Sequence, residues 1–429
     1  MLDINLIREK PQEVKKNLAK RKDPELLTIL GDIIEKDAAY RQMKYDLQKF
    51  ISQKNTISKE VGELKKQGKN EEAAEKLAEM KKLPEKVERE QAKLDNVHQE
   101  INQLLHRLPN LLHESVPYGK DSTQNVVVRK YGKISAPGFP LLNHVEIAEK
   151  LDLADFDRAN KIAGAGFFFL KNELALLDQA LARFAVDHLI KKGYTFIETP
   201  LMMKRKPYEG VTDLADFENV MYKIEGQDAY LIATSEHPLV AMFMDETIDE
   251  EKLPLKFVGL SQCFRKEIGS HGIDEKGLFR RHQFTKVEQL MFAKPEESWK
   301  LHEEIVATSE EIWQALGIPY HVINICTGDI GVVAAKKYDI EAWMPRTKEY
   351  KEIVSASHCT DYQARRLNIR CGKEGGQKRV LHTLNGTAIA TSRALVAILE
   401  NYQNKDGSIT IPEVLVPYMN GLKKIQRKK

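Results

Sequence analysis

Apolar side chains recur at alternating intervals of three and four residues over two stretches near the N-terminus. The first stretch contains Tyr40, Met43, Leu47, Phe50, Ile57, Val61 and Leu64, and the second contains Met80, Leu83, Val87, Leu94, Val97, Ile101, Leu104 and Leu108. This spacing places the apolar residues along one seam of each helix, as in a coiled coil. The pattern predicts a long antiparallel helical hairpin over about residues 32–108, after a short helical segment in residues 1–30.

The turn of this hairpin is expected in the polar segment KKQGKNEEAAEK between the two stretches. Gly68 can end the first helix, and Asn70 can cap the second. Pro84 lies inside the second stretch, where a missing backbone N–H removes one helical hydrogen bond. We therefore expect Pro84 to kink the second helix or to divide it.

The register of the hairpin is predicted from its two charged seam residues. If Leu64 faces Met80, then Lys54 lies opposite Glu90, and no other charged residue lies on either seam. We expect these two side chains to form an internal ion pair that fixes the register more than it adds stability. A chance coincidence is the alternative.

The first helix of the hairpin is the more basic. Residues 32–69 carry nine Lys/Arg and six Asp/Glu, whereas residues 70–108 carry seven and nine. A rigid arm with a basic side can bind a phosphate backbone. Taken alone, however, the arm is better explained as a solvated coiled coil or a protein-binding stalk.

The remainder of the chain mixes helical and strand patterns. Helices are predicted over residues 174–191 and 388–402, and strands over 194–200, 229–237, 257–267, 282–292 and 379–387, with one more near 125–131. Because the strands are not each followed by a helix, the order favours an α+β fold with an antiparallel sheet flanked by helices. No P-loop and no dinucleotide-binding glycine motif is present in the sequence.

Composition places the chain among soluble proteins. It has 429 residues and a net charge of +3, and no apolar stretch approaches the roughly 18 residues of a membrane helix. We expect a cytoplasmic protein with no membrane partner. The cysteines at 263, 326, 359 and 371 form no C-x-x-C pair, so reduced thiols are expected, and His358 with Cys359 and Cys371 is only a weak zinc pattern.

Two predicted strands carry residues suited to binding a nucleotide and an ammonium group. Alternation in residues 257–267 places Arg265 and Glu267 on one face, and the arginine fork can hold a phosphate or carboxylate. In residues 282–292, Phe284 can stack on a base, and Glu288 can accept from an ammonium or hydroxyl group. The glycine-containing connection, ending in Arg280 and Arg281, suits a flexible polyanion clamp. An edge-strand salt bridge and a plain surface hairpin are the alternatives.

Six segments together resemble the class II aminoacyl-tRNA synthetases, in the form of the seryl-tRNA synthetases. FRKEIGSHGIDEKGLFRRHQFTKVEQ is similar to motif 2, GYTFIETP to motif 1, and HTLNGTAIATSRALVAILENYQ to motif 3. ATSEH resembles the serine-site loop, YKEIVSASHCTDYQARRLNIR resembles the metal and ATP segment, and the hairpin resembles the N-terminal arm. The resemblance implies a class II antiparallel sheet and two domains, a tRNA-binding arm in residues 1–110 and a catalytic domain in 111–429.

The resemblance also implies the roles of individual residues. The catalytic residues would be Arg265 and Arg393. Serine would be bound by Thr234, Ser235, Glu236, Arg265, Glu288, Asn385 and Thr387. ATP would be bound by Arg265, Lys266, Glu267, Arg281, Phe284, Glu352, Ile353, Val354, Ser355 and Arg393. Mg²⁺ would be held by Glu352 and Ser355. Val354 departs from the serine common in the family at its position, which puts a side-chain contact there in doubt, and no zinc-binding insertion is present.

The activity implied is the ATP-dependent ligation of L-serine to tRNA-Ser, and also to tRNA-Sec, through a seryl-adenylate. The arm would bind tRNA-Ser, and motif 1 implies a homodimer. Three other readings remain, namely a homologue that has lost its chemistry, a class II synthetase for another amino acid, and a coiled-coil scaffold. The pairing of Thr234 and Glu236 with Glu288 favours serine, and the intact Arg265, Glu288, Glu352 and Arg393 favour an active enzyme.

Overall fold

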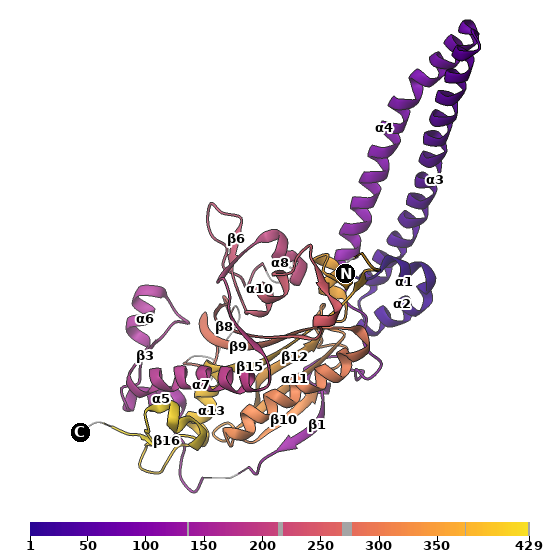
Figure 1. Ribbon diagram of the computed structural model, residues 1–429. Helices are drawn as coiled ribbons and strands as arrows, with labels where there is room; N and C mark the ends of the chain where they lie inside the picture. The colour runs from indigo at the N-terminus through magenta and orange to yellow at the C-terminus, as the bar shows by residue number, and fades with distance from the viewer. Residues whose placement is uncertain (135–136, 213–217, 268–276, 374, 428–429) are drawn as a thin grey trace. The chain divides into compact units, whose positions relative to one another are not determined.

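The computed structural model describes the chain except for residues 135–136, 213–217, 268–276, 374 and 428–429. Most of the predicted clamp loop therefore lies outside the described residues. The described residues form two compact units, Met1–Pro109 and Asn110–Lys429 (Figure 1). No helix among them is both long enough and apolar enough to cross a membrane.

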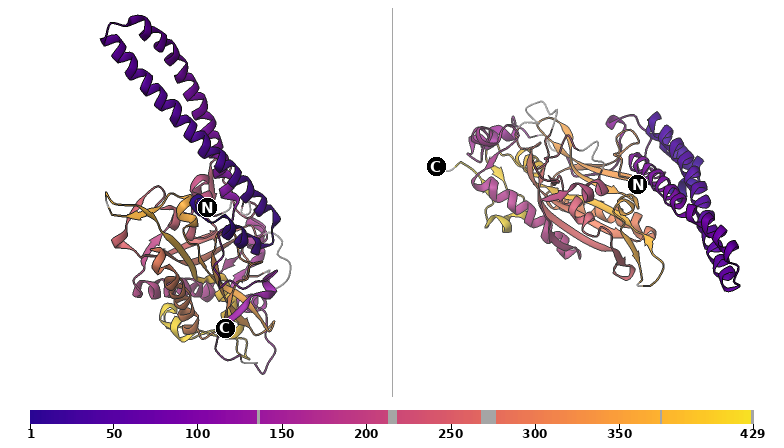
Figure 2. Two further views of the ribbon diagram at one scale, coloured as in Figure 1. Left: turned by 90° about the vertical axis from the view of Figure 1, so that its right-hand side faces the viewer. Right: turned by 90° about the horizontal axis from the view of Figure 1, so that it is seen from above.

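The first unit is entirely helical. Its elements are α1 (Ile4–Glu9), α2 (Pro11–Leu18), η1 (Ala19–Arg21), α3 (Pro24–Lys66) and α4 (Asn70–Arg107). The long helices α3 and α4 run side by side in all three views (Figures 1 and 2). Seam residues such as Leu47, Val61, Leu94 and Ile101 are buried, as the heptad spacing predicts. α4 continues through Pro84 as a single helix, so of the two expected effects of this proline, a kink or a division, the division does not occur.

The turn between these helices is shorter than predicted. α3 ends at Lys66, Gly68 adopts a left-handed conformation with φ +77°, and α4 begins at Asn70. Asn70 is thus the first helical residue rather than the cap, since Lys69 occupies the cap position without a side-chain hydrogen bond. The helices extend through most of the polar segment that the sequence pattern had left as a turn.

The predicted register of the hairpin is wrong by about one heptad. Lys36 pairs with Glu100 at 2.5 Å, and Lys86 lies 3.9 Å above the ring of Phe50, so facing residues are centred on position 68 rather than 72. Glu90 consequently does not pair with Lys54. It forms ion pairs with Arg89 and Lys93 of its own helix. The three-residue turn sets this register, because a heptad seam looks nearly the same after a shift of seven residues.

The second unit is built on an eight-stranded sheet in the order β1-β10-β11-β12-β15-β9-β8-β4. The strands are β1 (Val126–Tyr131), β10 (Tyr320–Asn324), β11 (Lys336–Met344), β12 (Glu349–His358), β15 (His382–Ala390), β9 (Gln283–Ala293), β8 (Leu255–Phe264) and β4 (Thr195–Glu198). All neighbours are antiparallel except β4 and β8, which are parallel. The predicted α+β class with an antiparallel sheet is confirmed.

Helices cover both faces of this sheet. One face is packed by α7 (Asn172–Lys191), α11 (Pro295–Ala315) and α13 (Thr391–Asn401), and the other by α8 (Arg205–Val211), α10 (Glu236–Ala241) and α12 (Tyr362–Arg366). Strand β9 shows the division, because Val287 and Met291 enter the first core whereas Leu290 and Phe292 enter the second. This is the two-residue alternation of a strand.

The remaining elements are short. They are η2 (Ser122–Gln124), α5 (His144–Lys150), β2 (Ala154–Asp155), α6 (Phe156–Ala163), β3 (Phe169–Leu170), β5 (Met202–Lys204), β6 (Ala229–Leu231), β7 (Thr247–Asp249), η3 (Glu250–Lys252), β13 (Arg370–Gly372), β14 (Arg379–Val380), β16 (Ile409–Thr410), η4 (Glu413–Met419) and β17 (Lys424–Ile425).

Two predicted element boundaries are corrected. The strand expected over 229–237 ends at Leu231 in β6, and Glu236 begins α10. The helix expected from residue 388 begins at Thr391, because residues 388–390 still belong to β15.

Candidate active site

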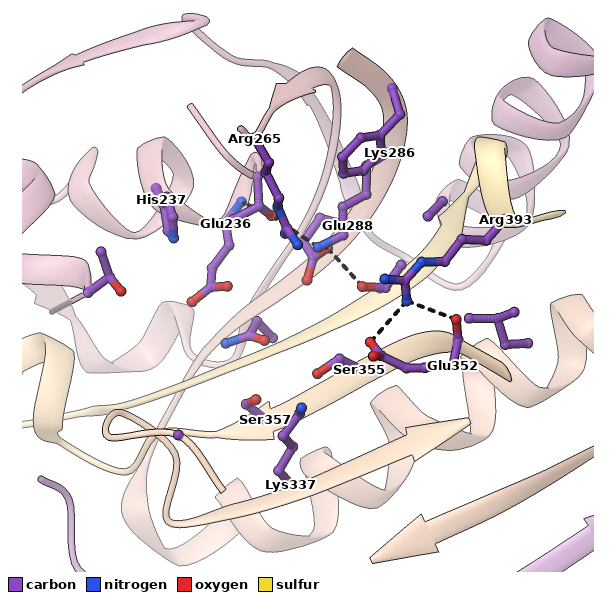
Figure 3. Close-up of a pocket in the computed structure, with 18 of the residues that line it drawn as sticks. Glu236, His237, Arg265, Lys286, Glu288, Lys337, Glu352, Ser355, Ser357 and Arg393 are labelled. Carbon is purple, nitrogen blue, oxygen red and sulfur yellow. Dashed lines mark hydrogen bonds and ion pairs between the residues drawn. The ribbon is translucent and has the colours of Figure 1, made fainter. Parts of the chain in front are cut away.

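A cavity of about 390 Å³ lies on the sheet face that carries the even-numbered side chains of β9 (Figure 3). Thirteen of the residues predicted from the sequence line it, namely Thr234, Glu236, Arg265, Glu267, Arg281, Phe284, Glu288, Glu352, Ile353, Ser355, Asn385, Thr387 and Arg393. Arg265, Glu288 and Arg393, which lie far apart in sequence, thus share one pocket. They reach it from the end of β8, from β9 and from the first turn of α13.

Three predicted site residues do not line this pocket. The buried Ser235 hydroxyl donates to the Gly259 carbonyl oxygen at 3.3 Å. Lys266 lies beside the ring of Tyr222. Val354 is 1% exposed and belongs to the apolar core beneath the sheet.

One end of the pocket is acidic. Glu288 is 1% exposed, and the Glu236 side chain enters the same space from the start of α10. Gln363 donates to Glu236 Oε1 at 3.0 Å, and Thr387 donates to Glu288 Oε2 at 3.4 Å. Burial, and then the negative charge of Glu288, raise the pKa of Glu236 to about 7. Burial also raises the pKa of Glu288, although Lys286 opposes this effect.

Two cations face these carboxylates. Lys286 Nζ lies 2.5 Å from Glu288 Oε2 and donates to Thr234 Oγ1 at 3.2 Å. Arg265 is anchored by its Nε, which donates to the Ala233 carbonyl oxygen at 3.2 Å. Figure 3 shows both side chains reaching toward Glu288. The arrangement can hold a small zwitterion, with its ammonium group at the acids and its carboxylate at the cations.

The middle of the pocket is aromatic and cationic. The Arg265 guanidinium lies 5.6 Å from the ring centre of Phe284. The strand alternation that placed Glu267 beside Arg265 does not hold, because β8 ends at Phe264 and Glu267 has a φ of +40°. Glu267 lines the pocket from this turn, and Arg280 Nη1 lies 3.9 Å from its carboxylate. A flat ring with a charged tail fits this lining.

Arginine 281 is more constrained than the sequence suggested. Its Nη1 donates to the Phe167 carbonyl oxygen at 3.2 Å, and its guanidinium lies 5.2 Å from the ring centre of Phe156. Burial lowers the pKa of this guanidinium to about 10. The adjacent Arg280 also lines the pocket and is more exposed. Of the two arginines, Arg280 has the greater freedom to follow a phosphate.

The far end of the pocket joins Arg393 to strand β12. Arg393 Nη1 contacts the Glu352 carbonyl oxygen at 2.8 Å and its Oε1 at 3.1 Å (Figure 3). Burial would raise the pKa of Glu352, but Arg393 and Lys337 outweigh it and lower that pKa to about 2. Glu352 is therefore a carboxylate at all ordinary pH values.

The oxygen donors at this end suit a magnesium ion. The Glu352 carboxylate and the Ser355 hydroxyl line the same pocket, and Asp339 is the cross-strand neighbour of Ser355. No cluster of three or more acidic, histidine or cysteine ligands was found in the described part of the chain. A site with one carboxylate and one hydroxyl fits Mg²⁺, which usually completes its octahedron with water and substrate phosphates.

Sequence reasoning did not assign Lys286, Lys337 or His237 to the site, although all three line it. The signal for Lys286 was present, because strand alternation already placed it on one face with Glu288. Lys337 lies on β11, and His237 follows Glu236 in α10. Neither lies in a pattern that points to the pocket before the sheet is assembled.

The comparisons with known proteins agree with this geometry. Residues 220–402 match the family model described as tRNA synthetase class II core domain (G, H, P, S and T). Residues 1–112 match the seryl-tRNA synthetase N-terminal domain. The antiparallel sheet with its pocket and the core-domain match define a class II aminoacyl-tRNA synthetase.

Individual relatives narrow the class. A serine–tRNA ligase from Methanocella arvoryzae is 55% identical over 424 residues, covering 98% of this chain and 99% of that protein. The crystal structure of seryl-tRNA synthetase from Pyrococcus horikoshii complexed with ATP is 46% identical, with a TM-score of 0.95 and full coverage of both chains. The cytoplasmic serine–tRNA ligase of Naegleria fowleri, in complex with AMP, is 36% identical, with a TM-score of 0.90 and coverage of 100% and 99%. The chain belongs to the seryl-tRNA synthetases, the serine–tRNA ligases of class II.

The placement of Val354 yields a prediction. Val354→Ser puts a hydroxyl group into an apolar core, which costs about 1–3 kcal/mol of stability, but it leaves the ATP site untouched. We expect a lower Tm in calorimetry with an unchanged Kd for ATP. Ser355→Ala is the comparison variant and should weaken ATP binding, because the Ser355 hydroxyl lines the pocket. A large loss of ATP affinity in Val354→Ser would show that position 354 contacts the nucleotide.

Proposed function

We propose that the pocket joins L-serine to the α-phosphate of ATP and then transfers the seryl group to tRNA-Ser. The observation that carries the proposal is the pairing of two carboxylates, the buried Glu288 and the partly buried Glu236, with two cations at one end of a pocket whose middle suits a nucleotide. The serine carboxylate attacks the α-phosphorus and expels pyrophosphate, and the terminal ribose hydroxyl of the tRNA then attacks the seryl-adenylate. We extend the proposal to tRNA-Sec, because serine transfer to it needs no other pocket.

Serine recognition is assigned to the acidic end. Glu236 and Glu288, with Thr234, Thr387 and Asn385, offer acceptors for one ammonium and one hydroxyl group, and Arg265 faces the substrate carboxylate. Ser235 does not contact serine but supports the site through its hydrogen bond to the Gly259 carbonyl oxygen. A site built around a hydroxyl should reject alanine strongly, because its buried polar groups would lose a partner.

ATP is assigned to the remainder of the pocket. Phe284 stacks on the adenine, Glu267 accepts from its amino group, and Arg265 binds the α-phosphate. Arg393, Arg280 and Arg281 follow the outer phosphates. Ile353 lines the ATP site, and Lys266 and Val354 support it without a side-chain contact to ATP. Glu352 and Ser355 hold Mg²⁺, which when bound neutralises charge on the phosphates. Catalysis then depends on positioning and charge stabilisation, with no side-chain nucleophile.

The helical unit is assigned to tRNA binding. α3 carries the excess of basic residues, and Lys44, Lys49 and Lys59 on it are exposed. Exposed lysines along a rigid helix can bind a phosphate backbone without reading sequence. We assign residues 1–110 to the arm and 111–429 to catalysis, in the cytoplasm.

A homodimer is proposed from the sheet edge. β4 is an edge strand, and Phe196 on it and the nearby Leu201 and Met202 are exposed. An uncovered apolar edge strand is a site for pairing with another chain. Sedimentation should show a dimer that Phe196→Glu dissociates, and a monomeric parent chain would refute the assignment.

The substrate is tested by pyrophosphate exchange with each amino acid in turn. Serine should support exchange at least about a hundredfold better than alanine, because the hydroxyl partners are buried. Threonine is the second comparison, since its extra methyl group probes the size of the pocket. Equal exchange with another amino acid, or no exchange with any, would contradict the proposal.

Removal of the arm should separate serine activation from the charging of tRNA-Ser. Lys36 and Glu100 face each other, so a short glycine linker between them can replace residues 37–99. The shortened chain should keep serine-dependent exchange within about threefold, because the pocket is built entirely from the second unit, and should lose tRNA-Ser charging. If the shortened chain charged tRNA-Ser at the parent rate, the arm would not be needed for tRNA binding, which would contradict the assignment.

The pKa of Glu236 predicts a pH dependence. A pKa of about 7 leaves this carboxyl group partly protonated at neutral pH, whereas an ammonium ligand requires the carboxylate. The KM for serine should therefore fall as pH rises from about 6 to about 8 and then level off. Glu236→Gln should raise this KM roughly 10–100-fold and flatten the profile. The KM for ATP serves as the internal control and should not follow this curve.

A further inference from the structure

Lys286 occupies the position between the two proposed substrate sites. Phe284, Lys286 and Glu288 alternate along β9 and line the same pocket. Neighbours on one strand face are spaced by about 7 Å, two residues at roughly 3.4 Å each. With adenine against Phe284 and the serine ammonium at Glu288, Lys286 lies beneath the point where the serine carboxylate meets the α-phosphate.

The contacts of Lys286 are with groups that serine would use. Its ammonium lies 2.5 Å from Glu288 Oε2 and 3.2 Å from Thr234 Oγ1. The residue is only 8% exposed, so its charge is balanced mainly by Glu288. Lys286 thus holds the place of a substrate ammonium group.

Two ammonium groups cannot share these acceptors. Like charges about 4 Å apart repel by about 4 kcal/mol at an effective dielectric constant of 20. The Arg265 side chain is held in place, because its Nε donates a hydrogen bond to the Ala233 carbonyl oxygen. The Lys286 ammonium stands on a flexible four-carbon stem, and both of its contacts among the described residues are the ones that serine would take over.

We propose that the serine ammonium displaces Lys286 from Glu288, and that Lys286 Nζ then contacts the serine carboxylate and the α-phosphate oxygens. In the step, a carboxylate oxygen bonds to the α-phosphorus while the bond to the bridging oxygen breaks, and the electron pair leaves with pyrophosphate. Lys286 stays protonated and transfers no proton. It stabilises charge that is greatest in the transition state, so it is a catalytic residue. This inference rests on the proposed serine activation.

The test compares Lys286→Met and Lys286→Arg with Lys256→Met. Lys256 is a matched control, because it lies on β8 and pairs with Glu304 of α11 at 2.6 Å, outside the pocket. Pyrophosphate exchange at saturating serine and ATP gives kcat, and calorimetry gives the Kd of serine at pH 8.5 and of a sulfamoyl analogue of seryl-adenylate.

Lys286→Met should lower kcat about a hundredfold, the effect of removing one oxyanion donor. The same variant should weaken binding of the adenylate analogue far more than binding of serine, because the Lys286 ammonium that competes with serine for Glu288 is gone. Lys286→Arg should recover part of kcat, and Lys256→Met should match the parent chain.

A kcat for Lys286→Met within threefold of the parent would overturn the inference, and so would an equal loss of affinity for serine and the analogue. Failure of the parent chain to exchange with serine would instead refute the proposed function. Unfolding curves of all three variants exclude a loss of kcat through instability.

Discussion

The site depends on one electrostatic constraint, two carboxylates that face the same small space, one of them fully and the other partly buried. Glu236 and Glu288 cannot both be ionised there without cations, and burial raises the pKa of each. Lys286 and Arg265 compensate this charge, and a substrate ammonium group can replace part of the compensation. Recognition of serine therefore depends on the same charge balance that keeps these carboxylates ionised.

The sheet is what makes this balance possible. Antiparallel pairing sets Glu288 of β9 opposite Thr387 of β15 on one side and opposite Gly259 of β8 on the other. The neighbouring glycine leaves room, since a Cβ at position 259 would lie within 3 Å of Ser235 and Leu239. Val287, Met291 and Ala293 of β9 meanwhile pack in the apolar core with α7, α11 and α13, so the same strand anchors the fold and carries the site.

The sequence predicted these features to different degrees, for physical reasons. Period-two alternation was enough to place Phe284, Lys286 and Glu288 together, because β9 is long and regular. The heptads predicted both arm helices but not their register. A heptad seam looks nearly the same after a shift of seven residues, so the length of the short turn sets the register. Glu267 lines the pocket with Arg265, as expected, but from a turn rather than a strand, whereas Val354 faces the apolar core. A left-handed residue and a bulge in the pairing of β11 with β12 interrupt the alternation there, and neither is visible in residue types alone.

A crystal structure with serine and a nonhydrolysable ATP analogue bound tests the central claim most directly. The account predicts the serine ammonium between Glu236 and Glu288, the adenine against Phe284, and the Lys286 ammonium moved away from Glu288 toward the carboxylate and α-phosphate. Serine bound elsewhere, or an ammonium group that avoids both carboxylates, would contradict it.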